Sequence, residues 1–181
     1  MKLLLLLLTI GTVSAYDTLL IDGPVYHKPY WDKIRLIGTI GTLETYFNHN
    51  SIQAENSYGL SIERMISPCV AFSVNGTTAN YKNYYLEDSH TNSLGAGFKF
   101  FVGENEYFRL FAGLGASHYW NDFIFKSNTI RFVPSLGLHL MLGDTLGLYG
   151  DIKTAIPVAQ LSGEKDTNRL FSANFGLIVQ I

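Results

Sequence analysis

Cysteine is almost absent from this sequence of 181 residues, because Cys69 is the only one. A single cysteine cannot form an intramolecular disulfide, which excludes the small disulfide-scaffolded classes. Charge is also scarce: 15% of the residues are charged, the formal net charge is −2, and no basic run interrupts this balance. We therefore expect no nucleic-acid partner. His, Cys, Asp and Glu nowhere recur at the spacing of metal ligands, so we expect no metal and no cofactor.

Long apolar runs are missing after the first residues, so no transmembrane helix is predicted. The N-terminus has one positive charge at Lys2, an apolar run over residues 3–10, and the small residues Val13, Ser14 and Ala15. This is the pattern of a secretory signal peptide, rather than of a buried N-terminal helix, and it predicts residues 1–15 as the signal with cleavage after Ala15. Two prolines argue against regular structure over residues 16–32, which we expect to form an N-terminal periplasmic segment.

Helical periodicity is hard to find after the signal, whereas strand periodicity is nearly everywhere. Short turns at 67–68, 103–105 and 143–145 alternate with longer polar connections at 48–56, 80–92, 121–128 and 159–168. Such alternation is typical of an antiparallel up-and-down meander. The predicted strands are residues 33–47, 57–66, 69–79, 93–102, 106–120, 129–142, 146–158 and 169–181.

The two faces of these strands differ in a way that distinguishes two kinds of barrel. One face is apolar; in 106–120 it carries Phe108, Leu110, Ala112, Leu114 and Ala116. The opposite face is rich in Gly and Ser and holds few charges, which suits the crowded interior of a closed eight-strand barrel. Strands of this length with an apolar outer face fit a tilted bilayer crossing. The alternative is a soluble sandwich or lipocalin-like barrel, whose outer face would carry many more charges.

Residues 33–181 are therefore predicted as an all-β, eight-stranded antiparallel up-and-down transmembrane β-barrel. The segment 33–47 has a mixed pattern, which a bulge would explain. The hairpins "SYGLSIERMISPCVAFSV" and "LGAGFKFFVGENEYFRLFAGLGA" place Gly on one face and apolar residues on the other. In topology and in these patterns the chain resembles the small outer-membrane barrels of the OmpA transmembrane-domain, OmpX and Ail/Lom type. It departs from them at its last residue, Ile181, where the family usually ends in an aromatic residue that helps recognition by the assembly machinery.

The inward parity places a set of ionisable side chains inside the barrel. Opposite charges are expected to pair across the lumen, because an unpaired buried ion costs several kcal/mol. Arg109 in particular needs an acidic partner, with Glu63 and Asp151 as candidates. The set is interpreted as a polar plug, with a narrow pore as the alternative. It consists of Glu63, Lys99, Arg109, Arg131, His139, Asp151 and Lys153, with Arg35 as a further candidate.

Residues in two of the long connections are candidates for contacts beyond the membrane. Rigid aromatic side chains make good binding anchors. The alternative is that these segments merely extend the strands above the membrane. The candidates are Tyr81, Tyr84, Tyr85, His90, Phe123 and Phe125.

Enzymatic activity is the weaker alternative, and no catalytic residue is assigned. Some barrels of this size modify lipids with a histidine and a serine, which must be held in hydrogen-bond geometry. Ser117 and His118 are adjacent, so they face opposite sides of a strand. Asp88, Ser89 and His90 offer suitable residue types, but polar residues in one loop are common.

These observations predict an outer-membrane protein of a Gram-negative bacterium or of a phage. Its expected role is structural and surface-interacting: envelope integrity, adhesion or ligand binding through extracellular loops. Narrow-pore activity for small solutes is the first alternative, and modification of lipid A or phospholipid is the second. The expected partners are outer-membrane lipids and lipopolysaccharide, the barrel assembly machinery, and a host-cell or phage surface ligand.

Overall fold

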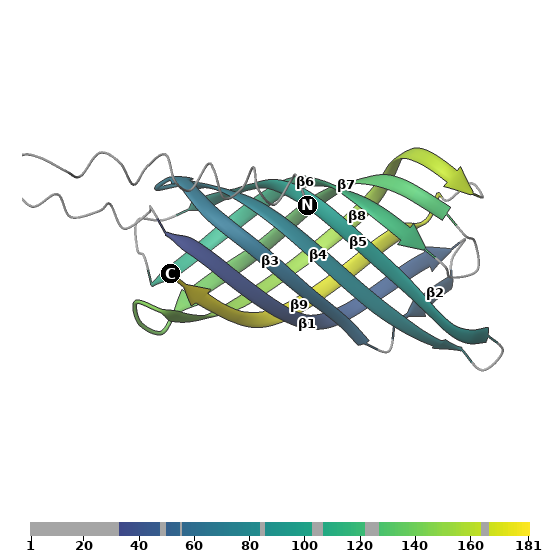
Figure 1. Cartoon of the computed structure of the whole chain (residues 1–181), viewed down its shortest axis with the longest axis horizontal. Helices are drawn as coiled ribbons and strands as arrows, with labels where there is room; N and C mark the ends of the chain where they lie inside the picture. Colours follow the sequence, from purple (N-terminus) through teal and green to yellow (C-terminus); the bar gives the residue numbers. More distant parts are fainter. Residues whose placement is uncertain are drawn as a thin grey trace, which may run out of the picture.

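The computed structural model describes residues 33–47, 50–54, 56–83, 86–102, 107–121, 127–163 and 167–181. These residues form one sheet that winds into a cylinder, with strands tilted to its long axis (Figure 1). No helix among them is long and apolar enough to cross a membrane. The strands are β1 (Ile34–Phe47), β2 (Asn50–Gln53), β3 (Asn56–Ser67), β4 (Val70–Asn83), β5 (Leu86–Val102), β6 (Phe108–Asn121), β7 (Ser127–Met141), β8 (Leu146–Gly163) and β9 (Arg169–Gln180).

The sheet closes because its first and last strands pair. β1 runs antiparallel to β9 from Arg35 opposite Gln180 to Tyr46 opposite Arg169, and it pairs with β3 on its other side. The strands follow one another in chain order from β3 to β9, so β1 and β3–β9 form an eight-stranded antiparallel barrel. Closure leaves no edge strand in the wall, which a membrane-spanning sheet requires. The fold class predicted from the sequence is confirmed.

β2 is a short addition at one end of the barrel. It pairs antiparallel with the end of β1, from Glu44 opposite Gln53 to Phe47 opposite Asn50. The predicted connection 48–56 therefore contains a strand of four residues. Figure 1 shows β2 at the right-hand end, opposite the end where β9 finishes beside the start of β1. We call the latter the short-turn end, because the turn at Pro68 and Cys69 and the turn 142–145 also lie there.

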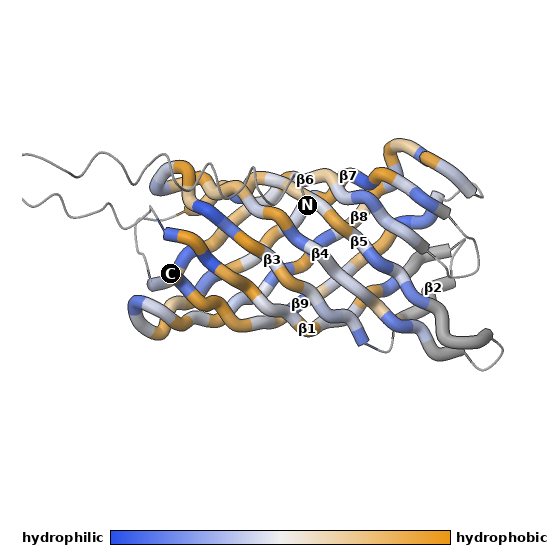
Figure 2. Tube along the Cα trace, in the orientation of Figure 1, coloured by the Kyte–Doolittle hydropathy of each residue, from blue (hydrophilic) through white to orange (hydrophobic). Residues whose placement is uncertain are grey.

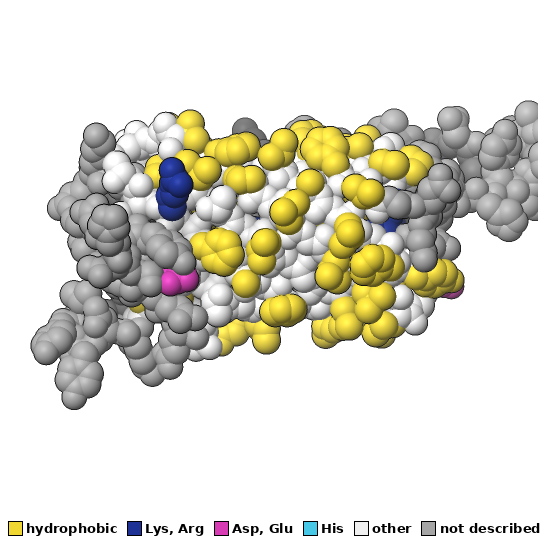
Figure 3. All heavy atoms as spheres, turned by 180° about the vertical axis from the view of Figure 1, so that it is seen from behind, with side chains coloured by type: hydrophobic (Ala, Val, Ile, Leu, Met, Phe, Trp, Pro, Cys, Tyr) yellow, Lys and Arg dark blue, Asp and Glu magenta, His cyan; other side chains and the backbone are white. Residues whose placement is uncertain are grey.

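The outside of the barrel is apolar along its length. On β6 the predicted outer face is confirmed: Phe108, Leu110, Ala112, Leu114 and Ala116 are all exposed. The alternation of apolar and polar residues continues along the other strands (Figure 2). In the face drawn in Figure 3, apolar side chains cover the middle of the barrel and charged side chains appear only towards its two ends. This is the surface that a lipid-facing barrel requires.

Glycine permits close approach of the backbone at a few inward positions. A Cβ atom on Gly176 would lie 2.0 Å from the backbone oxygen of Gly38 on the neighbouring β1. Gly38 faces the other way, and a Cβ atom there would meet nothing within 4 Å. The small inward face of the wall is thus a packing requirement, whereas the outward glycine lies in open space.

One expectation about strand regularity is wrong. β1 keeps its register with both neighbours without a bulge, placing Arg35, Ile37 and Leu43 inside. The mixed pattern arises because apolar side chains there lie on both faces. The register shifts instead near the ends of the β3–β4 and β4–β5 ladders and between β7 and β8, where Arg131 lies opposite Pro157 beside the shift. Proline cannot donate a hydrogen bond to a ladder, and it is confined to edges and bulges.

Candidate functional site: the filled lumen

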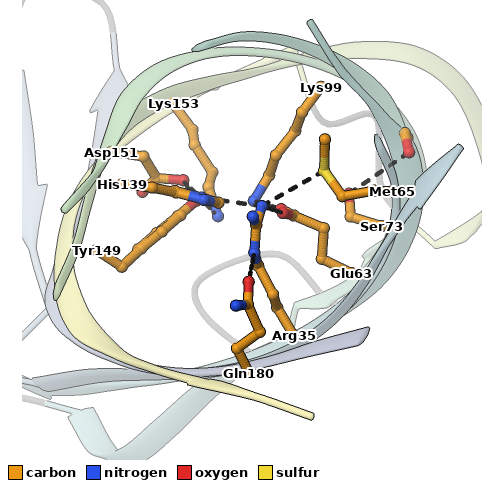
Figure 4. Close-up of polar contacts among 11 residues, drawn as sticks. Arg35, Glu63, Met65, Ser73, Lys99, His139, Tyr149, Asp151, Lys153 and Gln180 are labelled. Atoms are coloured by element: carbon orange, nitrogen blue, oxygen red, sulfur yellow. Dashed lines mark hydrogen bonds and ion pairs between the residues drawn. The ribbon is translucent and has the colours of Figure 1, made fainter. Parts of the chain in front are cut away.

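Glu63 is the centre of the first charge cluster in the lumen. Its side chain is fully buried; Oε1 accepts a hydrogen bond from Arg35 Nη1 at 3.1 Å, and Oε2 accepts one from Lys99 Nζ at 2.7 Å. Arg35 Nε also donates to Gln180 Oε1 at 3.0 Å. Arg35 lies opposite Glu63 in the β1–β3 register, so inward parity alone brings the two charges together. We call Arg35, Glu63, Lys99 and Gln180 the Glu63 cluster (Figure 4).

Asp151 is the centre of the second charge cluster. Its carboxylate accepts hydrogen bonds from the Tyr149 hydroxyl and from Asn174 Nδ2, the latter at 2.8 Å. Lys153 Nζ lies 3.0 Å from Asp151 Oδ2. We call Tyr149, Asp151, Lys153 and Asn174 the Asp151 cluster. Lys99 Nζ lies 4.7 Å from the centroid of the Tyr149 ring, so this ring joins the two clusters across the lumen (Figure 4).

Aromatic rings fill the lumen around these charges towards the short-turn end. The His139 ring lies among Phe101, Phe111 and Tyr149, with centroid distances of 5.0, 5.2 and 5.3 Å. His139 is buried, its ring nitrogens have no hydrogen-bond partner among the described residues, and Nε2 lies 3.8 Å from Glu63 Oε2. The Arg109 guanidinium lies 4.8 Å from the Phe101 ring centroid and donates to the Pro68 carbonyl oxygen in the turn after β3. Charge and rings together occupy this end of the barrel.

A separate group of side chains fills the opposite end. Arg131 donates to Thr129 Oγ1 at 3.1 Å and to the backbone oxygens of Ala155 at 3.3 Å and Asn168 at 2.5 Å. Its guanidinium lies 5.3 Å from the centroid of the Tyr119 ring. Around it is a buried apolar cluster, which we call the outer cluster: Leu43, Ala54, Ala79, Tyr81, Tyr119, Ala155 and Leu170.

Between the two filled ends lies a cavity of about 50 Å³. Lys99, Lys153, Asp151, Asn75 and several serine hydroxyls line it. A single water molecule needs roughly 10–15 Å³ of such space. The cavity therefore has room for a few waters or one small ion, and it is far too small for a general solute channel.

All the ionisable residues predicted for the lumen lie inside the barrel. Glu63, Lys99 and His139 come together at one point, and Asp151 and Lys153 at another, whereas Arg131 lies at the far end. The expected acidic partners of Arg109 lie with other cations: Glu63 with Arg35 and Lys99, Asp151 with Lys153. Side chains that complete the clusters were not predicted as site residues, although their inward parity was readable: Tyr149, Asn174 and Gln180.

The loop candidates have different positions. Tyr81 lies in β4 with only 2% of its side chain exposed, because β4 continues into the predicted connection and turns this ring into the outer cluster. Its assignment as an exposed loop contact is therefore corrected. His90 lies in β5, exposed, with Nδ1 2.8 Å from Asn80 Oδ1. Four of the candidates lie outside the described residues or among those whose side chains are not described: Tyr84, Tyr85, Phe123 and Phe125.

Neither histidine considered for lipid chemistry contacts a serine through a described bond. His90 is joined to Asn80, and the His118 ring packs on Trp120 with centroids 4.1 Å apart. No group of three His, Cys, Asp or Glu side chains among the described residues could hold a metal ion.

Comparison with solved structures places the fold among small outer-membrane barrels. Neisserial surface protein A is 14% identical, with a TM-score of 0.64 over 81% of this chain and 96% of that chain. Ail, the attachment invasion locus protein of Yersinia pestis, in complex with the heparin analogue sucrose octasulfate, is 11% identical, with a TM-score of 0.59 over 82% and 98%. OprG from Pseudomonas aeruginosa is 11% identical, with a TM-score of 0.51 over 83% and 96%. No protein-family model and no curated protein matches the sequence.

Proposed function

We propose that this chain is an outer-membrane protein of a Gram-negative bacterium or a phage, with a structural and surface-interacting role rather than a transport role. The observation that carries the proposal is the combination of an apolar outer surface with a lumen filled at both ends. The first requires lipid around the barrel, and the second leaves little room for solutes between the described side chains. We therefore assign ligand binding to the strand ends that extend beyond the membrane.

The hairpin of β7 and β8 supplies the best-defined binding surface. β8 pairs with β9 only as far as Ala155, whereas its pairing with β7 continues to Gly163. Its last part is visible at the upper right of Figure 1, where β8 bends away from the barrel. Val158 is 70% exposed and Leu161 57% exposed on this segment. An open strand edge that presents apolar side chains can accept an extended segment of a partner protein.

The charge of the long connections indicates what kind of partner fits. Residues 48–56, 80–92, 121–128 and 159–168 contain six acidic residues and three lysines, a formal net charge of −3. Ail is described in complex with a heparin analogue, which is a sulfated polyanion. An acidic rim repels such a ligand, so we propose a protein ligand with basic and apolar groups for this chain.

Export and insertion follow from the same proposal. Residues 1–15 act as the signal peptide, cleavage follows Ala15, and residues 16–32 remain on the periplasmic side. The barrel assembly machinery inserts the strands, and lipopolysaccharide and outer-membrane lipids surround them. Cell fractionation with heat-modifiable electrophoresis tests this: a folded barrel sediments with the outer membrane and changes mobility on boiling. A soluble periplasmic protein without a mobility change would instead indicate a lipocalin-like barrel.

Surface interaction is tested with hairpin variants. Cells that express the protein are expected to adhere to host-cell monolayers, and Val158→Asn with Leu161→Asn should reduce adhesion at an unchanged surface level. Leu142→Asn is the matched control, because Leu142 is equally exposed but lies in the turn at the short-turn end. Equal adhesion by both variants would contradict the assignment of the hairpin.

The two other functions have their own readouts. Purified protein in planar bilayers is expected to give no unitary conductance, and a stable conductance would favour the narrow pore. Changed acylation of lipid A or phospholipid on expression would favour an enzyme.

A further inference from the structure

Among the described side chains, the two charge clusters hold three cations and two carboxylates, which leaves one positive charge in surplus where the clusters border the cavity. Arg35, Lys99 and Lys153 face only Glu63 and Asp151 within these clusters. Both carboxylates are fully engaged by neighbouring donors. A surplus buried charge is costly unless an ion or a hydrogen-bonding group compensates it.

Lys153 is the group best placed to hold such an ion. An ammonium group has three donors, and the described interaction of Lys153 is its single ion pair with Asp151. Its side chain is 21% accessible although it lies inside the barrel, because it borders the cavity. Figure 4 shows Lys153 pointing inwards beside Asp151.

The wall of the cavity supplies further hydrogen-bond donors, and most of the side chains that carry them are small. Ser73, Asn75, Ser117 and Ser135 line it together with glycines. Ser135 lies directly opposite Lys153 in the β7–β8 register, so a hydroxyl and an ammonium adjoin. Hydroxyl, amide and ammonium donors around a volume of about 50 Å³ suit a small anion with a few waters.

We propose that this cavity is a binding site for a halide-sized inorganic anion, held by the Lys153 ammonium and the hydroxyl groups of the wall. The site is independent of the surface role proposed above, because it lies deep in the lumen. It adds a structural counter-ion to the barrel: the anion compensates the surplus charge of the two clusters. Loss of the anion therefore weakens the folded state.

The test uses the full mature protein, refolded in detergent micelles, and measures its unfolding midpoint in sodium chloride, bromide or gluconate at constant ionic strength. A ligand that binds only the folded state raises the midpoint in a saturable way. Chloride and bromide are expected to do so, and the bulkier gluconate is not. A midpoint that is the same in all three salts would overturn the proposal.

Two substitutions should move the apparent halide affinity in opposite directions. Lys153→Met is expected to raise the half-saturating concentration at least about tenfold, the loss expected for one charge-assisted hydrogen bond. Asp151→Asn is expected to lower it, because the ammonium no longer shares its charge with a carboxylate. Lys33→Met, the same change at the rim of the barrel, should leave it unchanged. An undiminished halide effect in Lys153→Met would refute the site.

A measurement on the unaltered protein guards against variants that do not fold. Crystals grown in sodium bromide are expected to show an anomalous scattering peak within the cavity, beside Lys153 Nζ. Bromide peaks confined to the outer surface, with none in the cavity, would overturn the proposal and leave the cavity to water.

Discussion

Removing the charge of Glu63 tests whether its carboxylate stabilises the buried cations of the Glu63 cluster. Glu63→Gln keeps the size of the side chain but leaves Arg35 and Lys99 without their carboxylate, and all three side chains are buried. Breaking a buried ion pair by removing one partner costs roughly 3–5 kcal/mol. The expected result is a loss of that size in the free energy of unfolding, measured by denaturant titration of the protein in micelles or vesicles. Glu44→Gln on the outside of β1 is the matched control and should cost about 1 kcal/mol or less.

A second variant separates charge pairing from mere packing. The triple change Arg35→Met, Glu63→Leu and Lys99→Met replaces the whole network with apolar groups of similar length. Because no ion then remains unpaired, its stability should equal or exceed that of the native chain, by up to about 4 kcal/mol. A cost below about 1 kcal/mol for Glu63→Gln, or a triple variant less stable than the single one, would refute the reasoning.

Three further predictions concern the wall and its orientation. Leu114→Arg, in the middle of the lipid face of β6, should destabilise the barrel in vesicles by about 2–4 kcal/mol, as measured by denaturant titration. Gly176→Ala should lower the unfolding midpoint because its Cβ atom would meet the backbone oxygen of Gly38, whereas Gly38→Ala should leave the midpoint equal or slightly higher. Cys69, exposed in a turn at the short-turn end, should react with a membrane-impermeant maleimide only after the outer membrane is permeabilised. Ser162→Cys in a Cys69→Ser background should react in intact cells, and the reverse pattern would invert the proposed orientation.

The period-two pattern was enough to predict the barrel and the side that faces lipid. Side-chain parity is a local property: once Leu110 is known to face outwards, Arg109 must face inwards. The alternation of short and long connections predicts the antiparallel up-and-down order, and closure is expected because an open sheet would leave unpaired edges in the hydrocarbon. Parity does not predict where a side chain lies along the barrel axis, because that position depends on the register and stagger between strands. Glu63 and Asp151, the acids expected to pair with Arg109, therefore lie on the predicted inner side of the wall. Their described ion pairs, however, are with other cations.

Strand ends were harder to predict because polar residues can continue an antiparallel ladder. β4, β5 and β8 extend into segments interpreted as connections, since pairing satisfies their backbones whatever the side chains. Tyr81 shows the consequence: a ring read as an exposed loop contact lies inside the lumen. Mixed hydropathy predicts a bulge in β1, whereas β1 is regular and the register shifts lie in other pairs, one of them beside Pro157, where a backbone donor is missing.

The position of that irregularity connects the barrel with its proposed surface role. Between Leu146 and Ala155, β8 pairs with β9 on one side and β7 on the other; above Ala155, towards Gly163, β7 is its only partner among the described residues. Arg131 lies opposite Pro157, just above the change, and it donates to the backbone oxygens of Ala155 in β8 and of Asn168 in the segment before β9. The guanidinium thus joins the two strands where they begin to separate. The filled lumen fixes the base of the β7–β8 hairpin, and the open edge above it is free to meet a partner without disturbing the wall.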